Sequence, residues 1–249
     1  MIRVCVAGVT GWTGSAVAAA VQAANDLQLV AGVSRSDPGS FSSVADALRT
    51  APDVLVDYTH AAVVRQNVEQ AIAAGVHVVV GSSGLSGEDY ERIDVLSRER
   101  GVGVIAAGNF SVGAALLLRL ATEAARHFET WEVIDYASFT KPDAPSGTAR
   151  ELAERLETVR APRIGVPVDD VLGAQEARGA SIAGTQVHSL RLPGFVVSTE
   201  VVFASGGQRL SLRHDAGDTA EPYVGGTLLA VRAVSGRVGL TRGLDSLLS

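Results

Sequence analysis

The stretch "RVCVAGVTGWTG", residues 3–14, decides the fold. A run of small apolar residues ends at Gly8, and Gly11 and Gly14 follow at three-residue spacing before an alanine-rich segment. This order is typical of a buried strand that turns tightly into a helix over residues 14–24. Glycines at such a turn let backbone amides at a helix N-terminus approach a pyrophosphate, although the turn also needs glycine for packing alone. The stretch therefore predicts a dinucleotide-binding βαβ unit.

Further apolar runs continue the pattern of this first strand. They span residues 27–33, 54–59, 76–80 and 102–107, with helical patterns between them. Strands that are apolar throughout and alternate with helices indicate a parallel sheet covered on both faces. The fold class of residues 1–110 is therefore α/β, a Rossmann-type doubly wound parallel sheet that binds a dinucleotide.

Beyond residue 110 the order of the elements changes. Helical patterns over residues 111–128 and 147–159 enclose one strand, and the strands that follow are alternating and antiparallel in character. We expect a C-terminal α+β domain with a mixed sheet over residues 111–215. A closing helix is expected within residues 216–249.

Composition excludes several classes of protein. The chain has 249 residues and a net charge of −6, without a dense cluster of basic residues, so nucleic acid is not the expected partner. A single cysteine, Cys5, rules out a disulfide framework within the chain. No apolar run approaches the roughly 18 residues of a membrane span, and a strand pattern begins at residue 2 without a signal peptide. We therefore expect a cytoplasmic protein with no membrane partner.

The end of the second predicted strand bears on the choice of nucleotide. Enzymes that select NAD usually carry an Asp or Glu there to hold the ribose 2′-hydroxyl. This chain has Ser34 and Arg35, and a guanidinium can pair with a 2′-phosphate. The hypothesis is a cofactor preference for NADPH over NADH. The alternative is that Arg35 is an ordinary surface residue.

The run "KPDAPSGT", residues 141–148, has the pattern of an anion-binding corner. Ser146, Gly147 and Thr148 precede a predicted helix, whose first amides carry partial positive charge and suit a carboxylate. Lys141 adds a full charge close by. The alternative for this run alone is a capped helix after a proline turn. The segments "GSSG" (residues 81–84) and "GNFS" (residues 108–111) favour a ligand site, because they follow predicted parallel strands at the edge where α/β sheets bind ligands.

Taken together, these motifs resemble those of the dihydrodipicolinate reductase family of bacterial lysine biosynthesis. The resemblance rests on "VAGVTGWTG", "GSSG", "AAGNFSVG", "KPDAPSGTA", "VHSLRLPG" and "LRHDA", which occur in this order over nearly the whole chain. It implies hydride transfer from a nicotinamide to C4 of a cyclic, unsaturated or imine carboxylate, and a homotetramer. It also implies that residues 111–215 serve substrate binding and oligomerisation, and that the C-terminal helix of residues 216–249 completes the first, dinucleotide-binding domain.

The resemblance also implies roles for particular residues. The catalytic residue would be Lys141, and the substrate, a small carboxylate, would be bound by Lys141, Gly147 and Thr148. Further candidates for substrate binding are Ser146, Ser138 and His188. The alternative for His188, in an alternating strand, is a half-buried residue bonded to the backbone. The cofactor would be held by Gly8, Val9, Thr10, Gly11, Trp12, Thr13, Ser34, Arg35, Gly81, Ser82, Ser83, Ala107, Gly108, Asn109 and Phe110. No pair of His, Asp or Glu has metal-ligand spacing, so no metal is expected.

The chain departs from the family pattern at three positions. Ala137 and Ser138 stand where the family normally has two histidines, the first read as the acid and the second as a carboxylate contact. Trp12 replaces an arginine of the glycine loop. Three hypotheses stay open: the usual reaction with a proton from water, His188, Tyr136 or Lys141; a paralogue that reduces a different cyclic imine or unsaturated acid; and a nucleotide- or dicarboxylate-binding protein without turnover.

A rival resemblance concerns the glycine loop alone. "GVTGWTG" is also similar to the loop of N-acetyl-glutamyl-phosphate reductase and related acyl-phosphate reductases. Those enzymes need a cysteine nucleophile in the second domain, whereas Cys5 lies on the first predicted strand. The sequence therefore argues against a thioester mechanism.

Overall fold

The structure is a computed structural model that describes residues 1–248. The chain divides into two compact units. The first contains residues 1–112 and the described residues from Ala220 onward, and the second contains Gly113–Thr219. None of the described helices is long and apolar enough to cross a membrane.

The first unit is built on a parallel sheet. Its strand order is β11-β5-β4-β3-β1-β2, and every neighbouring pair is parallel. The bounds are β1 (Ile2–Ala7), β2 (Leu27–Val33), β3 (Val54–Asp57), β4 (His77–Val80), β5 (Gly103–Ala106) and β11 (Gly239–Arg242). The chain reverses its direction of travel across the sheet between β2 and β3, which lie on opposite sides of β1. This is the topological switch point at which such sheets bind ligands.

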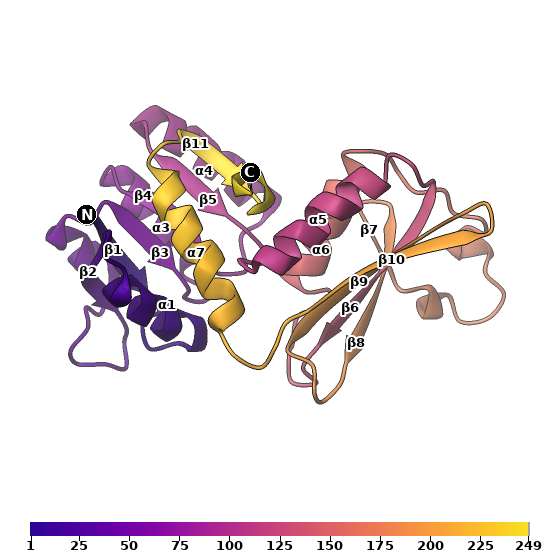
Figure 1. Ribbon diagram of the computed structural model, residues 1–249, viewed down its shortest axis with the longest axis horizontal. Coiled ribbons are helices and arrows are strands. Elements are labelled where there is room, and N and C mark those ends of the chain that lie inside the picture. Colours follow the sequence, from indigo (N-terminus) through magenta and orange to yellow (C-terminus); the bar gives the residue numbers. More distant parts are fainter. Residues whose placement is uncertain (249) are drawn as a thin grey trace. The chain divides into compact units, whose positions relative to one another are not determined.

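Helices cover both faces of this sheet. Figure 1 shows α1 and α7 on one face and α3 and α4 on the other. The bounds are α1 (Trp12–Ala23), α2 (Val44–Ala47), α3 (Val64–Ala73), α4 (Gly87–Arg100) and α7 (Glu221–Val234), with short 3₁₀ turns at Leu48–Thr50 and Asp245–Leu247. Most residues of β1, β3, β4 and β5 are buried, which explains why these strands are mainly apolar.

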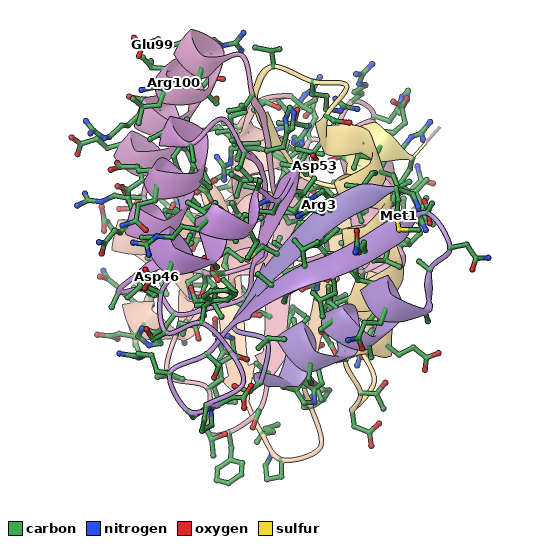
Figure 2. The ribbon with its side chains drawn as sticks, turned by 90° about the vertical axis from the view of Figure 1, so that its left-hand side faces the viewer. Met1, Arg3, Asp46, Asp53, Glu99 and Arg100 are labelled. Carbon is green, nitrogen blue, oxygen red and sulfur yellow. The ribbon has the colours of Figure 1, made fainter. Side chains whose placement is uncertain are left out.

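The two edges of the first sheet differ in chemistry. Figure 2 shows Arg3 and Asp53 close together at the amino-terminal edge. The Arg3 amide donates to the Asp53 carboxylate at 2.8 Å, and the Arg3 guanidinium donates to the Ala51 carbonyl at 3.0 Å. At this edge the side chains are therefore bonded to neighbouring backbone groups. The opposite edge, at the carboxyl ends of the strands, carries the glycine and hydroxyl residues of the candidate site.

The second unit is a mixed sheet with helices packed on one face. Its strand order is β10-β9-β6-β8-β7, in which β6 and β8 are parallel and the other pairs are antiparallel. The bounds are β6 (Thr130–Ala137), β7 (Ala180–Ile182), β8 (Thr185–Arg191), β9 (Val197–Ser205), β10 (Gln208–Asp215), α5 (Val112–Ala124) and α6 (Gly147–Glu157), with 3₁₀ turns at Val168–Asp170 and Gln175–Arg178.

Strand β6 alternates strictly between buried and half-buried residues. Trp131 and Val133 face the helices and form a core with Phe203 of β9 and Leu152 of α6. The residues between them face the other side of the sheet. A strand with one covered face requires this alternation, because successive side chains point to opposite faces.

The predicted fold class is confirmed in both units. The sequence did not predict β11. A closing helix was the only element expected within residues 216–249. Residues 239–242 instead add a sixth strand beside β5. The run Gly239-Leu240-Thr241-Arg242 contains only one strongly apolar residue, so it lacked the apolar signal of the other strands. Strand β7 was also missed because it is short and largely exposed.

Helix α7 contains two consecutive glycines with opposite surroundings, and they provide a test of the packing. A Cβ at Gly226 would lie 2.0 Å from the carbonyl oxygen of Phe110, whereas nothing lies within 4 Å of one at exposed Gly225. We expect Gly226→Ala to lower the free energy of unfolding by about 1–3 kcal/mol through overpacking. Gly225→Ala should raise it by about 0.5–1 kcal/mol, because alanine is the better helix former. Urea denaturation measures both, and equal effects would contradict the packing of α7.

Candidate active site

The glycine loop packs closely against the end of β3. Gly8 has φ +83°, and a Cβ there would lie 2.2 Å from the Tyr58 carbonyl oxygen. The Gly8 amide donates to the Val33 carbonyl of β2 at 2.9 Å. The loop is thus fixed between β1, β2 and β3, and only glycine fits its first position. Helix α1 begins directly afterwards at Trp12, with Gly11 as its N-cap.

Hydroxyl groups gather between this loop and the end of β2. The Thr10 and Ser34 hydroxyls are 2.8 Å apart, and those of Ser34 and Ser36 are 3.1 Å apart. Arg35 lies between the two serines and is exposed. The structure therefore brings the predicted residues Thr10, Ser34 and Arg35 together. Each hydroxyl can donate or accept, so the group suits either a ribose hydroxyl or a phosphate.

A buried carboxylate organises the end of β3. Asp57 has no exposed surface, and its Oδ1 accepts bonds from the Thr59 hydroxyl at 2.7 Å and the Ser82 hydroxyl at 2.6 Å. Its Oδ2 accepts from the Asn67 amide at 2.8 Å. This network holds the predicted residue Ser82, at the end of β4, against the neighbouring strand. A buried carboxylate is stable only when its oxygens are satisfied in this way.

The ends of β4 and β5 complete this edge of the sheet. Ala107 donates its amide to the Val80 carbonyl at 3.3 Å, and the Ser111 amide donates to the Asn109 side chain at 2.8 Å. The predicted residues of both segments lie at carboxyl ends of neighbouring parallel strands: Gly81, Ser82, Ser83, Ala107, Gly108, Asn109 and Phe110.

The tryptophan of the glycine loop lies against a second aromatic ring. The rings of Trp12 and Tyr223 meet edge to face with centroids 5.8 Å apart. About half of the Trp12 surface is exposed (52%). Trp12 therefore offers an aromatic surface where the family has a cation.

The second unit contains the anion corner, which we define as residues 141–148. Ser146 is the N-cap of α6, and its hydroxyl accepts a bond from the Ala149 amide at 3.3 Å. Lys141 Nζ lies 2.8 Å from the Asp143 carboxylate, and a turn connects the Lys141 amide to the Ser138 carbonyl at 3.0 Å. Lys141 is the only lysine in a chain with 21 lysines and arginines together.

The alternation of β6 and β8 separates two groups of polar residues. His188 pairs in register with Ile134, and its Nε2 lies 2.7 Å from the Glu132 carboxylate. Asp135 and Arg191 occupy the opposite face of the sheet, toward the helices and Ser146. The structure therefore does not bring His188 to the anion corner, although the sequence hypothesis included it there.

Tyr136 also belongs to the face that carries His188. Its hydroxyl donates to the Glu200 carboxylate at 3.1 Å, and Arg213 lies over its ring at 4.7 Å. Burial raises the pKa of the Tyr136 phenol, and the nearby Glu200 carboxylate raises it further. The phenol is a weak acid in this position.

The only cysteine, Cys5, is an unreactive buried thiol. Burial in β1, and secondarily the nearby Asp57 carboxylate, raise the pKa of Cys5 to about 12. A thiol with so high a pKa carries almost no thiolate at neutral pH and cannot serve as a nucleophile. Within residues 1–248, no group of three or more His, Cys, Asp or Glu side chains is arranged to hold a metal ion.

Family models match both units of the chain. The model for the N-terminus of dihydrodipicolinate reductase matches residues 2–110, and the model for the C-terminus matches residues 113–248. The chain belongs to the dihydrodipicolinate reductase family. The family resemblance seen in the sequence is thus confirmed, and with it the class of protein, an NAD(P)H-dependent oxidoreductase.

Individual members of the dihydrodipicolinate reductase family agree over the full length. A 4-hydroxy-tetrahydrodipicolinate reductase from Mycobacterium sp. (strain KMS) is 41% identical over 248 residues, which cover 99% of each chain. The enzyme of that name from Cutibacterium acnes is 39% identical over 251 residues, covering 100% of this chain and 99% of the relative.

Solved structures show the same fold. Dipicolinate-bound dihydrodipicolinate reductase from Paenisporosarcina sp. TG-14 is 30% identical to this chain, with a TM-score of 0.81. The match covers 100% of both chains. GenD2 from gentamicin A biosynthesis, in complex with NAD, is 19% identical with a TM-score of 0.69, covering 99% of this chain and 90% of GenD2, and shares the fold alone.

Two buried carboxylates that organise the candidate residues, one in each unit, were not expected from the sequence. Asp57 ends the apolar run "VLVD", and Asp135 occupies an inward position of the alternating strand β6. A carboxylate at a position that the pattern assigns to the core is a signal of a buried network, and this signal was available in the sequence.

Proposed function

We propose that the chain is a 4-hydroxy-tetrahydrodipicolinate reductase that transfers hydride from NAD(P)H to a cyclic, unsaturated dicarboxylate in lysine biosynthesis. The observation that carries this proposal is the anion corner, where the only lysine of the chain, paired with Asp143, precedes a helix N-terminus capped by Ser146. Relatives of 39–41% identity over the full length have this activity in their names.

The first unit has the residues to hold the nucleotide. The glycine loop packs so closely against the backbone of Tyr58 that a Cβ at Gly8 would not fit, and the amides at the start of α1 would face the pyrophosphate. Ser34, Arg35 and Thr10 would hold the adenosine ribose, while Ser82 and Asn109 belong to the nicotinamide side. When bound, the reduced nicotinamide supplies the hydride.

The anion corner would bind a carboxylate of the substrate. The amides of Gly147 and Thr148 belong to the first turn of α6, where partial positive charge favours an anion. Lys141 adds a full positive charge, and its partner Asp143 holds Nζ in one position at 2.8 Å. Together they fix the orientation of the ring, and positioning of this kind is a large part of the catalytic effect.

Lys141 is also the proton donor in this proposal. Addition of hydride to C4 leaves a pair of electrons on the neighbouring carbon, and that carbon must receive a proton. Tyr136 and His188 are bonded to Glu200 and Glu132 on the other face of the sheet, and Ala137 has no proton to give. A lysine ammonium can release a proton, whereas a guanidinium cannot at physiological pH.

The pair Lys141→Arg and Lys141→Ala tests this role. Arginine keeps the positive charge but cannot deliver the proton, so we expect Lys141→Arg to bind dipicolinate within a few-fold of the unchanged protein and to lose about 10²–10⁴-fold in kcat. Lys141→Ala should lose both binding and turnover. The assay follows NADPH absorbance with enzymatically generated substrate, and nucleotide affinity serves as the control. A Lys141→Arg protein with near-normal kcat would show that only the charge matters.

We further propose a preference for NADPH, carried by Arg35. A guanidinium can pair with a 2′-phosphate through two hydrogen bonds, and the surrounding hydroxyls of Ser34 and Ser36 add no repelling charge. The comparisons support a nicotinamide cofactor without distinguishing the two nucleotides.

Arg35→Ala should remove most of this preference. We expect kcat/KM with NADPH to fall about 10–100-fold, as is typical for a lost charge-assisted bond, while kcat/KM with NADH changes less than threefold. Steady-state kinetics with both nucleotides provide the measurement. An unchanged NADPH-to-NADH ratio would remove Arg35 from the proposal.

Restoring the family histidines tests the proton donor from the other side. Ala137 is fully buried, so Ala137→His with Ser138→His should lower the free energy of unfolding by about 1–3 kcal/mol through overpacking. Because Lys141 already supplies the proton, kcat should not rise. Thermal unfolding and kcat are measured on the double variant. A rise of tenfold or more would show that the acid was the missing group and that Lys141 is not the donor.

Ala137 and Ser138 also favour a second candidate function. Because they remove the two family histidines near the substrate, the chain could be a paralogue that reduces a different cyclic imine or unsaturated carboxylic acid. The same assay with a panel of cyclic imines separates the two candidates. Binding of nucleotide and dicarboxylate without any turnover would leave the non-catalytic alternative.

We also propose a homotetramer in the cytoplasm. The face of the second sheet that carries His188 borders a cavity of about 1100 Å³. Its lining is mainly apolar and includes Ile134, Ile164, Val166, Leu172, Leu190 and Val202. Contact with other copies of the chain would cover these apolar side chains.

A further inference from the structure

A buried ion pair lies behind the anion corner. Asp135, on the helix-facing side of β6, has no exposed surface, and Arg191 of β8 donates to its Oδ2 at 2.8 Å. The same carboxylate accepts the Ser146 amide at 2.9 Å and the Ser146 hydroxyl at 2.6 Å. Ser189 adds a longer bond at 3.2 Å. One carboxylate therefore ties the N-cap of α6 to two strands of the sheet.

Arg191 reaches the other part of the corner. The nitrogen that pairs with Asp135, Nη2, also donates to the Asp143 carbonyl at 2.7 Å. Asp143 in turn holds Lys141 Nζ through its carboxylate. The contacts thus form a continuous chain from Ser146 through Asp135 and Arg191 to Lys141.

We propose that Asp135 and Arg191 are a positioning pair that sets the distance between Lys141 and the amides of α6. The inference rests on the proposed function, because it assigns these amides and Lys141 to one substrate carboxylate. Ser146 donates two hydrogen bonds to the Asp135 carboxylate, and these bonds fix Ser146 and with it the first turn of α6. The bond from Arg191 to Asp143 fixes the segment that carries Lys141. Neither residue of the pair is required to touch substrate.

Electrostatics and positioning predict opposite effects of changing Asp135. Asp135→Asn removes a negative charge from a site for anions, so electrostatics alone predicts tighter binding of a dicarboxylate. Asparagine, however, presents an amide donor where the aspartate accepts bonds from several donors, and it leaves Arg191 without its countercharge. Positioning therefore predicts weaker binding. The direction of the change distinguishes the two effects.

The experiment measures substrate KM, kcat, NADPH affinity, dipicolinate affinity by calorimetry and Tm for three variants. For Asp135→Asn we expect substrate KM and the dipicolinate Kd to rise at least about tenfold, with NADPH affinity unchanged within twofold. Arg191→Lys keeps the charge of the pair but not the planar, multi-donor guanidinium. Substrate KM should therefore rise, while Tm should fall less than it does in Asp135→Asn. Asp26→Asn, which removes a carboxylate from an exposed pair with Arg232 in the first unit, is the matched control and should leave KM unchanged.

The double variant Asp135→Asn with Arg191→Met separates positioning from folding. Replacing both charges removes the unpaired ion, so Tm should recover toward that of the unchanged protein. The double variant still lacks the bonds that hold Ser146 and Asp143 in place, so substrate KM should remain raised. A double variant in which KM recovers together with Tm would reduce the pair to a structural role. Tighter dipicolinate binding in Asp135→Asn would overturn the proposal directly.

Failure of this inference is distinguishable from failure of the proposed function. If the unchanged protein does not reduce the substrate, the proposed function fails, and the dipicolinate measurements still test the pair. If the unchanged protein is active and KM is the same in all three variants, only the positioning pair is wrong.

Discussion

Successive side chains of β6 point to opposite faces of the second sheet, and the chemistry of the anion corner depends on this alternation. Asp135 points toward the helices, where it meets Ser146 and Arg191. Tyr136, one residue later, points to the other face and meets Glu200. A shift of one residue in register would exchange the two, placing a phenol at the corner and a carboxylate on the open face. The register of β6 against β8 and β9 therefore decides which side chains lie next to Ser146 and the anion corner.

The nucleotide end of the molecule depends on backbone shape more than on charge. Gly8 is forced by its close approach to the Tyr58 carbonyl, and the amides of the loop are what such a turn offers to a pyrophosphate. Trp12 replaces the family's arginine in that loop without removing any of those amides. Asp57 and Asp135 have similar roles. The buried Asp57 accepts a bond from Ser82 just after β4, and the buried Asp135 accepts one from Ser146 at the start of α6. Each unit thus uses a buried carboxylate to fix a serine.

The fold class could be predicted from the sequence because the patterns that indicate it lie within short stretches of the chain. Apolar runs and glycine spacing identify parallel strands, and alternation identifies the strands of the second sheet. The sequence did not reveal β11, because its four residues carry little apolar signal and join the sheet only through pairing with β5. It also could not separate His188 from the anion corner. The two are distinguished by the register of β8 against β6, which depends on the tertiary pairing of the strands.

The loss of the family histidines is compatible with a working reductase because the two parts of the reaction differ in what they require. Holding a substrate in reactive geometry is worth effective concentrations of about 10⁵–10⁸ M, whereas a general acid typically contributes about 10²–10⁴-fold. The residues proposed to position the substrate carboxylate are present in this chain. The missing acid is the smaller contribution, and in the proposed function Lys141 replaces it. All other strongly basic side chains of the chain are arginines, which hold their protons too firmly for this role, so the proposal assigns it to the one lysine.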